Sequence, residues 1–198
     1  MEILEKNKRA LERVMPKFLE QRPVAAGVKN VFLEMAEDGK QILGIERENR
    51  KWYLNSRYDT AFAAAVYAGR YQIRTYGTYF VFGFSDGRHV REFLKKCDDT
   101  NHIVICEPSV EIFEECCEQS DISDILEDKR VRFYIPDVTD SIEDIMKKNL
   151  QYSDFTFTEF CILPGYDILF HEECEEFQNL IIERLRDEAV KKGTSLSF

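Results

Sequence analysis

Apolar residues recur at helical spacing among charged residues over the first twenty positions. This spacing predicts one amphipathic helix that ends before Pro23, because the residue before a proline disfavours the helical conformation. Further along, Val31-Phe-Leu-Glu-Met and Gln41-Ile-Leu-Gly-Ile flank a turn that contains Asp38-Gly39, which is typical of a β-hairpin. Trp52-Tyr-Leu-Asn predicts a third strand of the same meander. We therefore expect residues 1–57 to form a small N-terminal subdomain, a helix followed by a β-meander. The apolar positions of the predicted helix are Ile3, Leu4, Leu11, Val14, Phe18 and Leu19.

An alanine-rich helix is expected to follow, with Asp59 or Ser56 as its N-cap. From residue 78 onwards, short apolar runs alternate with amphipathic stretches, a pattern that predicts a mostly parallel sheet with flanking helices. Residues 58–198 are thus expected to form an α/β domain. The expected strands are Tyr79–Phe82, His102–Cys106, Val131–Ile135 and Phe157–Leu163. The expected helices are Gly87–Lys96, Val110–Gln119, Ser141–Asn149 and Glu172–Lys192, with a helical turn at Ile122–Leu126.

Composition and charge exclude some kinds of molecule as binding partners of the chain. The chain has 198 residues, of which 44% are apolar, enough for a hydrophobic core. Its net charge of −10 opposes binding to a nucleic-acid backbone, so no nucleic acid is expected as a partner. The longest uncharged apolar stretch, Thr60–Gly69, is too short to span a bilayer.

The start of the chain and its cysteines suggest where the protein resides. The first residues are charged and resemble no signal peptide. The six cysteines form no CxxC pair and lie in apolar patterns, which favours buried, reduced thiols and a cytoplasmic location. No metal is expected, because the three histidines have no metal-ligand spacing. The chain ends at Gly193-Thr-Ser-Leu-Ser-Phe after a charged helix, which suggests a boundary where a longer protein continues. The cysteines are Cys97, Cys106, Cys116, Cys117, Cys161 and Cys174.

The segment from Tyr79 to Pro108 has the order of a Rossmann-like unit: a strand, a glycine turn from Gly83 to Gly87, a helix and a second strand. Such a turn favours bound anions at the strand ends. Glu107 closes the second strand, where dinucleotide and S-adenosylmethionine folds keep an acidic side chain that binds ribose hydroxyls. Asp137 follows the third strand and would lie near a base. The candidate cofactor-binding residues are Gly83, Ser85, Asp86, Gly87, Glu107 and Asp137, and the candidate cofactors are a nucleotide or S-adenosylmethionine.

A structural interpretation of the same residues stays open. Gly83 can serve only the turn, and Gly87 only close helix packing. Glu107 and Asp137 can be ordinary solvated carboxylates or helix caps. The middle glycine of G-x-G-x-x-G is replaced by Ser85 and Asp86, and an acidic side chain there opposes a pyrophosphate more than a cationic methyl donor.

The glycine turn also matches the nucleophile elbow G-x-S-x-G, with Ser85 as the nucleophile. Its partners would be Asp137 or Asp154, followed by His171. The chain is short for such a hydrolase, and no His-Gly-Gly oxyanion signature is present, so this interpretation is disfavoured. His89 is expected on a helix surface and His102 at a strand entry. Tyr166, in the loop after the last strand, can stack on a base or cover the core, and the core is favoured.

Taken in order, several short motifs resemble the N-terminal domain of the motility accessory factor (Maf) family of flagellin glycosyltransferases. The resemblance extends over nearly the whole chain. Gly83, Gly87 and His89 match the family's G-x-G-x-G turn and the histidine after it, whereas Ser85 departs from it. The matching segments are Asn55-Ser-Arg-Tyr-Asp, Phe80–Leu94, Ile103–Phe113, Asp124–Phe133 and Leu163-Pro-Gly-Tyr.

The resemblance implies a role in attaching nonulosonic sugars such as pseudaminic acid to bacterial flagellin. In that family, glycosyl transfer belongs to a separate domain that follows the N-terminal one. This chain would then be a non-catalytic module that supports assembly or substrate recognition, with flagellin or a downstream glycosyltransferase domain as its partner. The alternative is a methyltransferase-like domain that binds S-adenosylmethionine or a nucleotide through Glu107 and the glycine turn.

Overall fold

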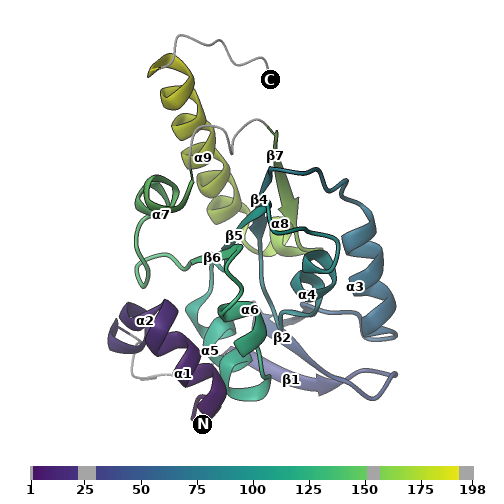
Figure 1. Cartoon of the computed structure of the whole chain (residues 1–198). Helices are drawn as coiled ribbons and strands as arrows, with labels where there is room; N and C mark the ends of the chain where they lie inside the picture. Colours follow the sequence, from purple (N-terminus) through teal and green to yellow (C-terminus); the bar gives the residue numbers. More distant parts are fainter. Residues whose placement is uncertain (1, 22–29, 151–156, 192–198) are drawn as a thin grey trace.

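The computed structural model describes residues 2–21, 30–150 and 157–191 (Figure 1). The N-terminal part contains two helices, α1 (Glu5–Val14) and α2 (Pro16–Gln21), where the sequence predicted one. That prediction was wrong because Pro16 pushes Met15 out of the helical region, to φ −143° and ψ 55°. The meander was predicted correctly, with β1 (Val31–Met35), β2 (Gln41–Arg47) and β3 (Arg50–Tyr53) pairing antiparallel in that order.

The second sheet is parallel and has the strand order β6-β5-β4-β7. Each strand lies within one or two residues of its predicted bounds. The two inner strands, β4 and β5, are buried almost throughout and form continuous apolar runs. The first of these strands in the chain, β4, is an inner strand. The chain continues to β5 and β6 on one side of β4 and then returns to β7 on its other side. This is the Rossmann-like arrangement that the sequence predicted. The four strands are β4 (Gly77–Phe82), β5 (His102–Cys106), β6 (Val131–Tyr134) and β7 (Phe157–Ile162).

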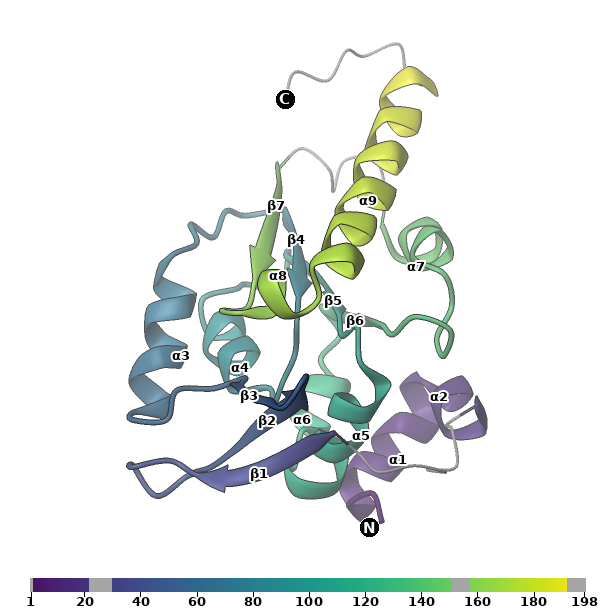
Figure 2. The same cartoon turned by 180° about the vertical axis from the view of Figure 1, so that it is seen from behind.

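Helices cover both faces of this sheet (Figures 1 and 2). Side chains alternate along β4, so Tyr79 packs against Phe93 of α4 at 5.3 Å between ring centroids. On the opposite face, Phe80 and Phe82 pack against Phe177 of α9. The helices are α3 (Thr60–Gly69), α4 (Arg88–Leu94), α5 (Val110–Gln119), α6 (Ser123–Leu126), α7 (Ile142–Asn149), α8 (Tyr166–Leu169) and α9 (His171–Lys191). Asp59 is the N-cap of α3, and its side chain accepts a hydrogen bond from the Phe62 amide at 2.8 Å.

The meander packs across the carboxyl ends of the parallel strands (Figure 2). The Arg47 guanidinium donates to the Leu169 carbonyl at 2.8 Å, and the Arg88 guanidinium donates to the Gln41 carbonyl at 2.8 Å. Leu43 and Leu54 of the meander segment belong to the same hydrophobic core as the parallel strands. The edge of the sheet where open α/β folds bind ligands is therefore partly covered by the chain's own N-terminal part. The predicted division at residue 57 stays a prediction.

Five of the six cysteines are buried free thiols, as the sequence predicted, and Cys97 is partly buried. Within the described residues, no helix has both the length and the apolar character needed to cross a membrane.

Candidate functional site

The glycine turn lies at the carboxyl end of β4, as predicted. Gly83, Ser85 and Gly87 all have positive φ, at 97°, 55° and 79°. The Gly83 amide donates to the Cys106 carbonyl at 2.8 Å, which holds the turn beside the end of β5. A positive φ is easy for glycine but strained for Ser85, so the neighbouring contacts must fix the loop.

Glu107 fixes this loop. Its side chain is 0% exposed, so the interpretation of a solvated carboxylate was wrong. The carboxylate accepts hydrogen bonds from the amides of Phe84 at 2.9 Å, Ser85 at 3.2 Å and Ser109 at 3.0 Å. A fourth hydrogen bond comes from the Tyr166 hydroxyl at 2.9 Å. All four donors belong to the chain itself, so Glu107 links β5 to the glycine turn.

Tyr166, which follows Glu107 by 59 residues in the chain, completes the network. Gly165, at φ 83°, is the N-cap of the short helix α8, whose first residue is Tyr166. The Tyr166 hydroxyl accepts from the Ser85 amide at 3.0 Å, and its ring lies so close to Gly83 that a Cβ there would be 2.7 Å from it. The ring is fully buried, which confirms that Tyr166 belongs to the core.

Burial raises the pKa of Glu107 from 4.5 to about 7, because the loss of solvation outweighs its hydrogen bonds. A carboxyl whose pKa is raised on folding stabilises the protein most below the unfolded pKa, and this contribution is lost as the pH rises through the folded value. We expect the unfolding free energy of the wild type, minus that of Glu107→Gln, to fall between pH 4.5 and 7 and to level off above. Urea unfolding of both proteins across this range measures the difference.

This comparison also removes the contribution of His89, whose pKa is lowered by burial and which therefore acts in the opposite direction below pH 6.5. A difference that stays constant from pH 4.5 to 7.5 would contradict a raised pKa of Glu107.

The other candidate residues have more local contacts. Asp86 is buried and forms an ion pair with Arg88 at 3.0 Å. A Cβ on Gly87 would lie 2.9 Å from the Phe84 ring, so Gly87 permits close packing. Asp137 is exposed after β6, and it forms no hydrogen bond with the turn in the described part of the chain. The structure thus brings five of the six predicted residues together, and their binding of a cofactor stays a prediction.

Ser85 has the strained backbone of a nucleophile but not its surroundings. Its side chain is fully buried, and its hydroxyl donates to the Asn55 Oδ1 at 3.2 Å. His171 is exposed, and its Nε2 lies 3.4 Å from Oε1 of Glu175. Asp154, the other acid considered for a hydrolase, lies outside the described residues. The Ser85 hydroxyl therefore connects the turn to the meander.

A cavity of about 290 Å³ lies next to the turn, between α3, α4 and the segments that follow β3 and β7. It adjoins the carboxyl ends of β4 and β7, where the strand order reverses and ligands bind in such sheets. His89 lines it and is only 3% exposed, so its predicted place on a helix surface was wrong. The helix bearing His89 packs against α3, which no local pattern around His89 reveals. The lining residues are Tyr53, Leu54, Asn55, Ser56, Ala63, Val66, Tyr67, Arg70, His89 and Pro164.

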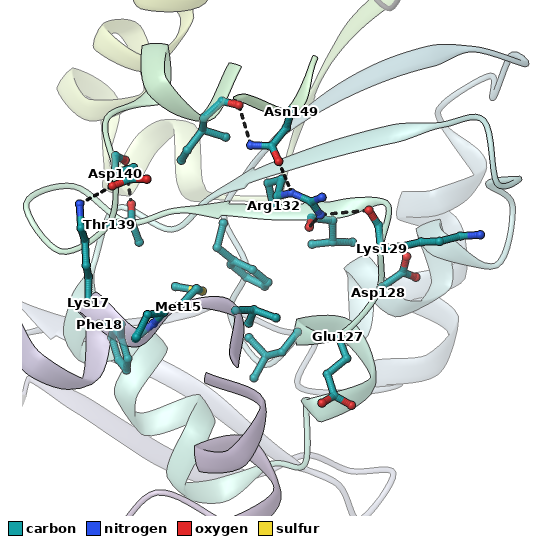
Figure 3. Close-up of a pocket in the computed structure, with 16 residues that line it drawn as sticks. Met15, Lys17, Phe18, Glu127, Asp128, Lys129, Arg132, Thr139, Asp140 and Asn149 are labelled. Atoms are coloured by element: carbon teal, nitrogen blue, oxygen red, sulfur yellow. Dashed lines mark hydrogen bonds and ion pairs between the residues drawn. The ribbon is translucent and has the colours of Figure 1, made fainter. Parts of the chain in front are cut away.

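A larger hollow of about 520 Å³ lies beside the edge strand β6, between the first two helices and α7 (Figure 3). Its charged groups already have partners. Lys17 pairs with Asp140, and the Arg132 guanidinium donates to the Asn149 side chain at 2.7 Å. Its size alone therefore does not indicate a ligand site. Within the described residues, no group of three or more His, Cys, Asp or Glu side chains is arranged to hold a metal ion.

Comparison with known proteins adds little to this description. No family model matches the chain, and no curated protein matches it. Among solved structures, it is similar to fibrillarin from Aeropyrum pernix, which was crystallised with natively bound S-adenosyl-L-methionine. The identity is 11%, and the match covers 60% of this chain and 55% of fibrillarin, with a TM-score of 0.28. A similarity this low carries no functional conclusion, and the Rossmann-like fold rests on the strand order.

Proposed function

We propose that this chain is a non-catalytic, Rossmann-like module of the Maf type, which supports assembly or substrate recognition beside a flagellin glycosyltransferase domain. The observation that carries the non-catalytic part is the network of Glu107, Tyr166 and Ser85. Tyr166 donates to Glu107 at 2.9 Å and accepts from the Ser85 amide at 3.0 Å. The groups that would hold a ribose in a methyltransferase are bonded to the chain's own tyrosine.

A nucleoside could reach Glu107 only by displacing the Tyr166 ring from Gly83. That step would leave buried amides without acceptors, at a cost of about 1–3 kcal/mol for each. The Maf part of the proposal is supported by the ordered motifs, from Asn55-Ser-Arg-Tyr-Asp to Leu163-Pro-Gly-Tyr. Both end segments of this set lie at the glycine turn, since Asn55 bonds to Ser85 and Tyr166 bonds to Glu107.

Calorimetry tests the non-catalytic part. We expect S-adenosylhomocysteine, ATP and a nucleotide sugar to release no binding heat at millimolar concentration, because Tyr166 blocks Glu107. Binding of any of them that is lost in Glu107→Gln, with the variant's fold verified by circular dichroism, would instead favour the methyltransferase-like alternative.

Biolayer interferometry tests the Maf part. The immobilised chain is expected to bind purified flagellin or a Maf-type glycosyltransferase domain saturably, and to ignore an equally acidic control protein. Failure to bind either partner would remove the Maf part of the proposal.

A further inference from the structure

Three residues that line the cavity between α3 and α4 each carry a buried polar atom with no hydrogen-bond partner among the described residues: Asn55 Nδ2, the Tyr67 hydroxyl and His89 Nδ1. These three residues are 7%, 1% and 3% exposed. Buried polar groups in native proteins are nearly always satisfied, and an unpaired one costs about 1–3 kcal/mol. Three such atoms around a single cavity therefore indicate an occupant with polar groups.

The orientation of Asn55 is fixed by its other contacts. Its Oδ1 accepts from the Leu43 amide at 3.3 Å and from the Ser85 hydroxyl at 3.2 Å. Because only an oxygen can accept both bonds, the amide nitrogen must be the atom left without a partner. Asn55 thus has two N–H donors without a partner among the described residues.

Tyr67 and His89 carry the other two polar atoms without a partner among the described residues. Their rings meet edge to face, with centroids 5.4 Å apart. Burial lowers the pKa of His89, so the imidazole is neutral at physiological pH and Nδ1 can donate or accept one hydrogen bond. Asp86, the acidic group that most favours the charged form of His89, is itself paired with Arg88.

The charge of the lining favours an anion. Among the described residues that line it, Arg70 is the one charged residue and none is a carboxylate, although the chain carries 37 acidic residues. Arg70 forms no ion pair with the described residues, whereas most lysines and arginines around the larger hollow are paired. The volume of about 290 Å³ suits a small molecule rather than a dinucleotide.

We propose that this cavity binds a small hydroxylated organic anion, whose carboxylate or phosphate meets Arg70 and the Asn55 amide and whose hydroxyl bonds to Tyr67 and His89. The inference goes beyond the proposed function and does not rest on it, because none of these residues belongs to the Glu107–Tyr166 pair.

Nuclear magnetic resonance of the isotope-labelled full chain tests the proposal, with lactate as the carboxylate probe and glycerol 3-phosphate as the phosphate probe. Sodium chloride keeps the ionic strength constant, and neutral glycerol is the uncharged control. We expect at least one probe to shift the Asn55 side-chain amide and His89 imidazole signals saturably, and the tighter probe identifies the anionic group. Arg70→Gln is expected to raise its dissociation constant at least tenfold.

Arg50→Gln is the matched control, because it removes an equal charge from an exposed site outside the cavity lining. We expect it to change the dissociation constant less than twofold. The proposal is overturned if neither probe shifts these signals, which would leave water as the occupant. Equal weakening in both variants, or equal binding of glycerol, overturns it as well.

Discussion

Replacing Glu107 with alanine is expected to lower the free energy of unfolding by about 3–5 kcal/mol, a large effect for one residue. The substitution removes the common acceptor of three backbone amides and the Tyr166 hydroxyl, all in a site from which solvent is excluded. The Ser85 amide keeps Tyr166 as an acceptor, but the amides of Phe84 and Ser109 lose their side-chain partner. The loop, with Ser85 at φ 55°, then loses the contacts that hold its strained backbone.

Urea unfolding measures this effect as a fall of the midpoint at a constant dependence on denaturant. Glu12→Ala is the matched control, because it removes an exposed carboxylate from a helix and should change the stability by less than about 0.5 kcal/mol. A loss below 1 kcal/mol in Glu107→Ala would mean that the amides find other acceptors, and that Glu107 is not what holds the turn.

Gly83→Ala is expected to cost about 2–4 kcal/mol. Its φ of 97° is unfavourable for alanine, and the added Cβ would lie 2.7 Å from the buried Tyr166 ring. The ring cannot move away freely, because its hydroxyl is bonded to both Ser85 and Glu107. Thermal and urea unfolding of the variant check this value.

Gly69→Ala provides the contrast, since Gly69 has no positive φ and no atom within 4 Å of an added Cβ. This control should be neutral or slightly stabilising, because alanine is favoured over glycine in a helix. In a Tyr166→Leu background, Gly83→Ala should cost less than it does alone, because the ring is absent. Equal costs in the two backgrounds would show that backbone strain, and not the ring, is responsible.

Most of the parallel sheet was predictable from the sequence, because its inner strands, β4 and β5, are buried almost throughout and stand out as apolar runs. The predicted bounds of His102–Cys106 and Val110–Gln119 coincide with β5 and α5. Helix ends were predicted less well where one residue decides them. Pro16 divides the first helix, whereas the predicted helix continued to the residues before Pro23.

The contacts of the site were harder to predict, because they join segments far apart in the chain. Glu107 was identified from its spacing after Gly83, but its bond to Tyr166 spans 59 residues and the bond of Ser85 to Asn55 spans 30. Local patterns contain no information about such pairs. His89 was misplaced for the same reason, since its burial depends on α3, which ends twenty residues earlier.

The buried thiols can report how often the core of this protein opens. Burial raises the pKa of Cys106, Cys116 and Cys161, so these sulfurs are neither accessible nor ionised at neutral pH. They belong to strands β5 and β7 and to helix α5, and thus sample the centre of the molecule. A thiol reagent can modify them only when the sheet separates from its helices. The rate of labelling therefore measures how often the core opens, without any engineered cysteine.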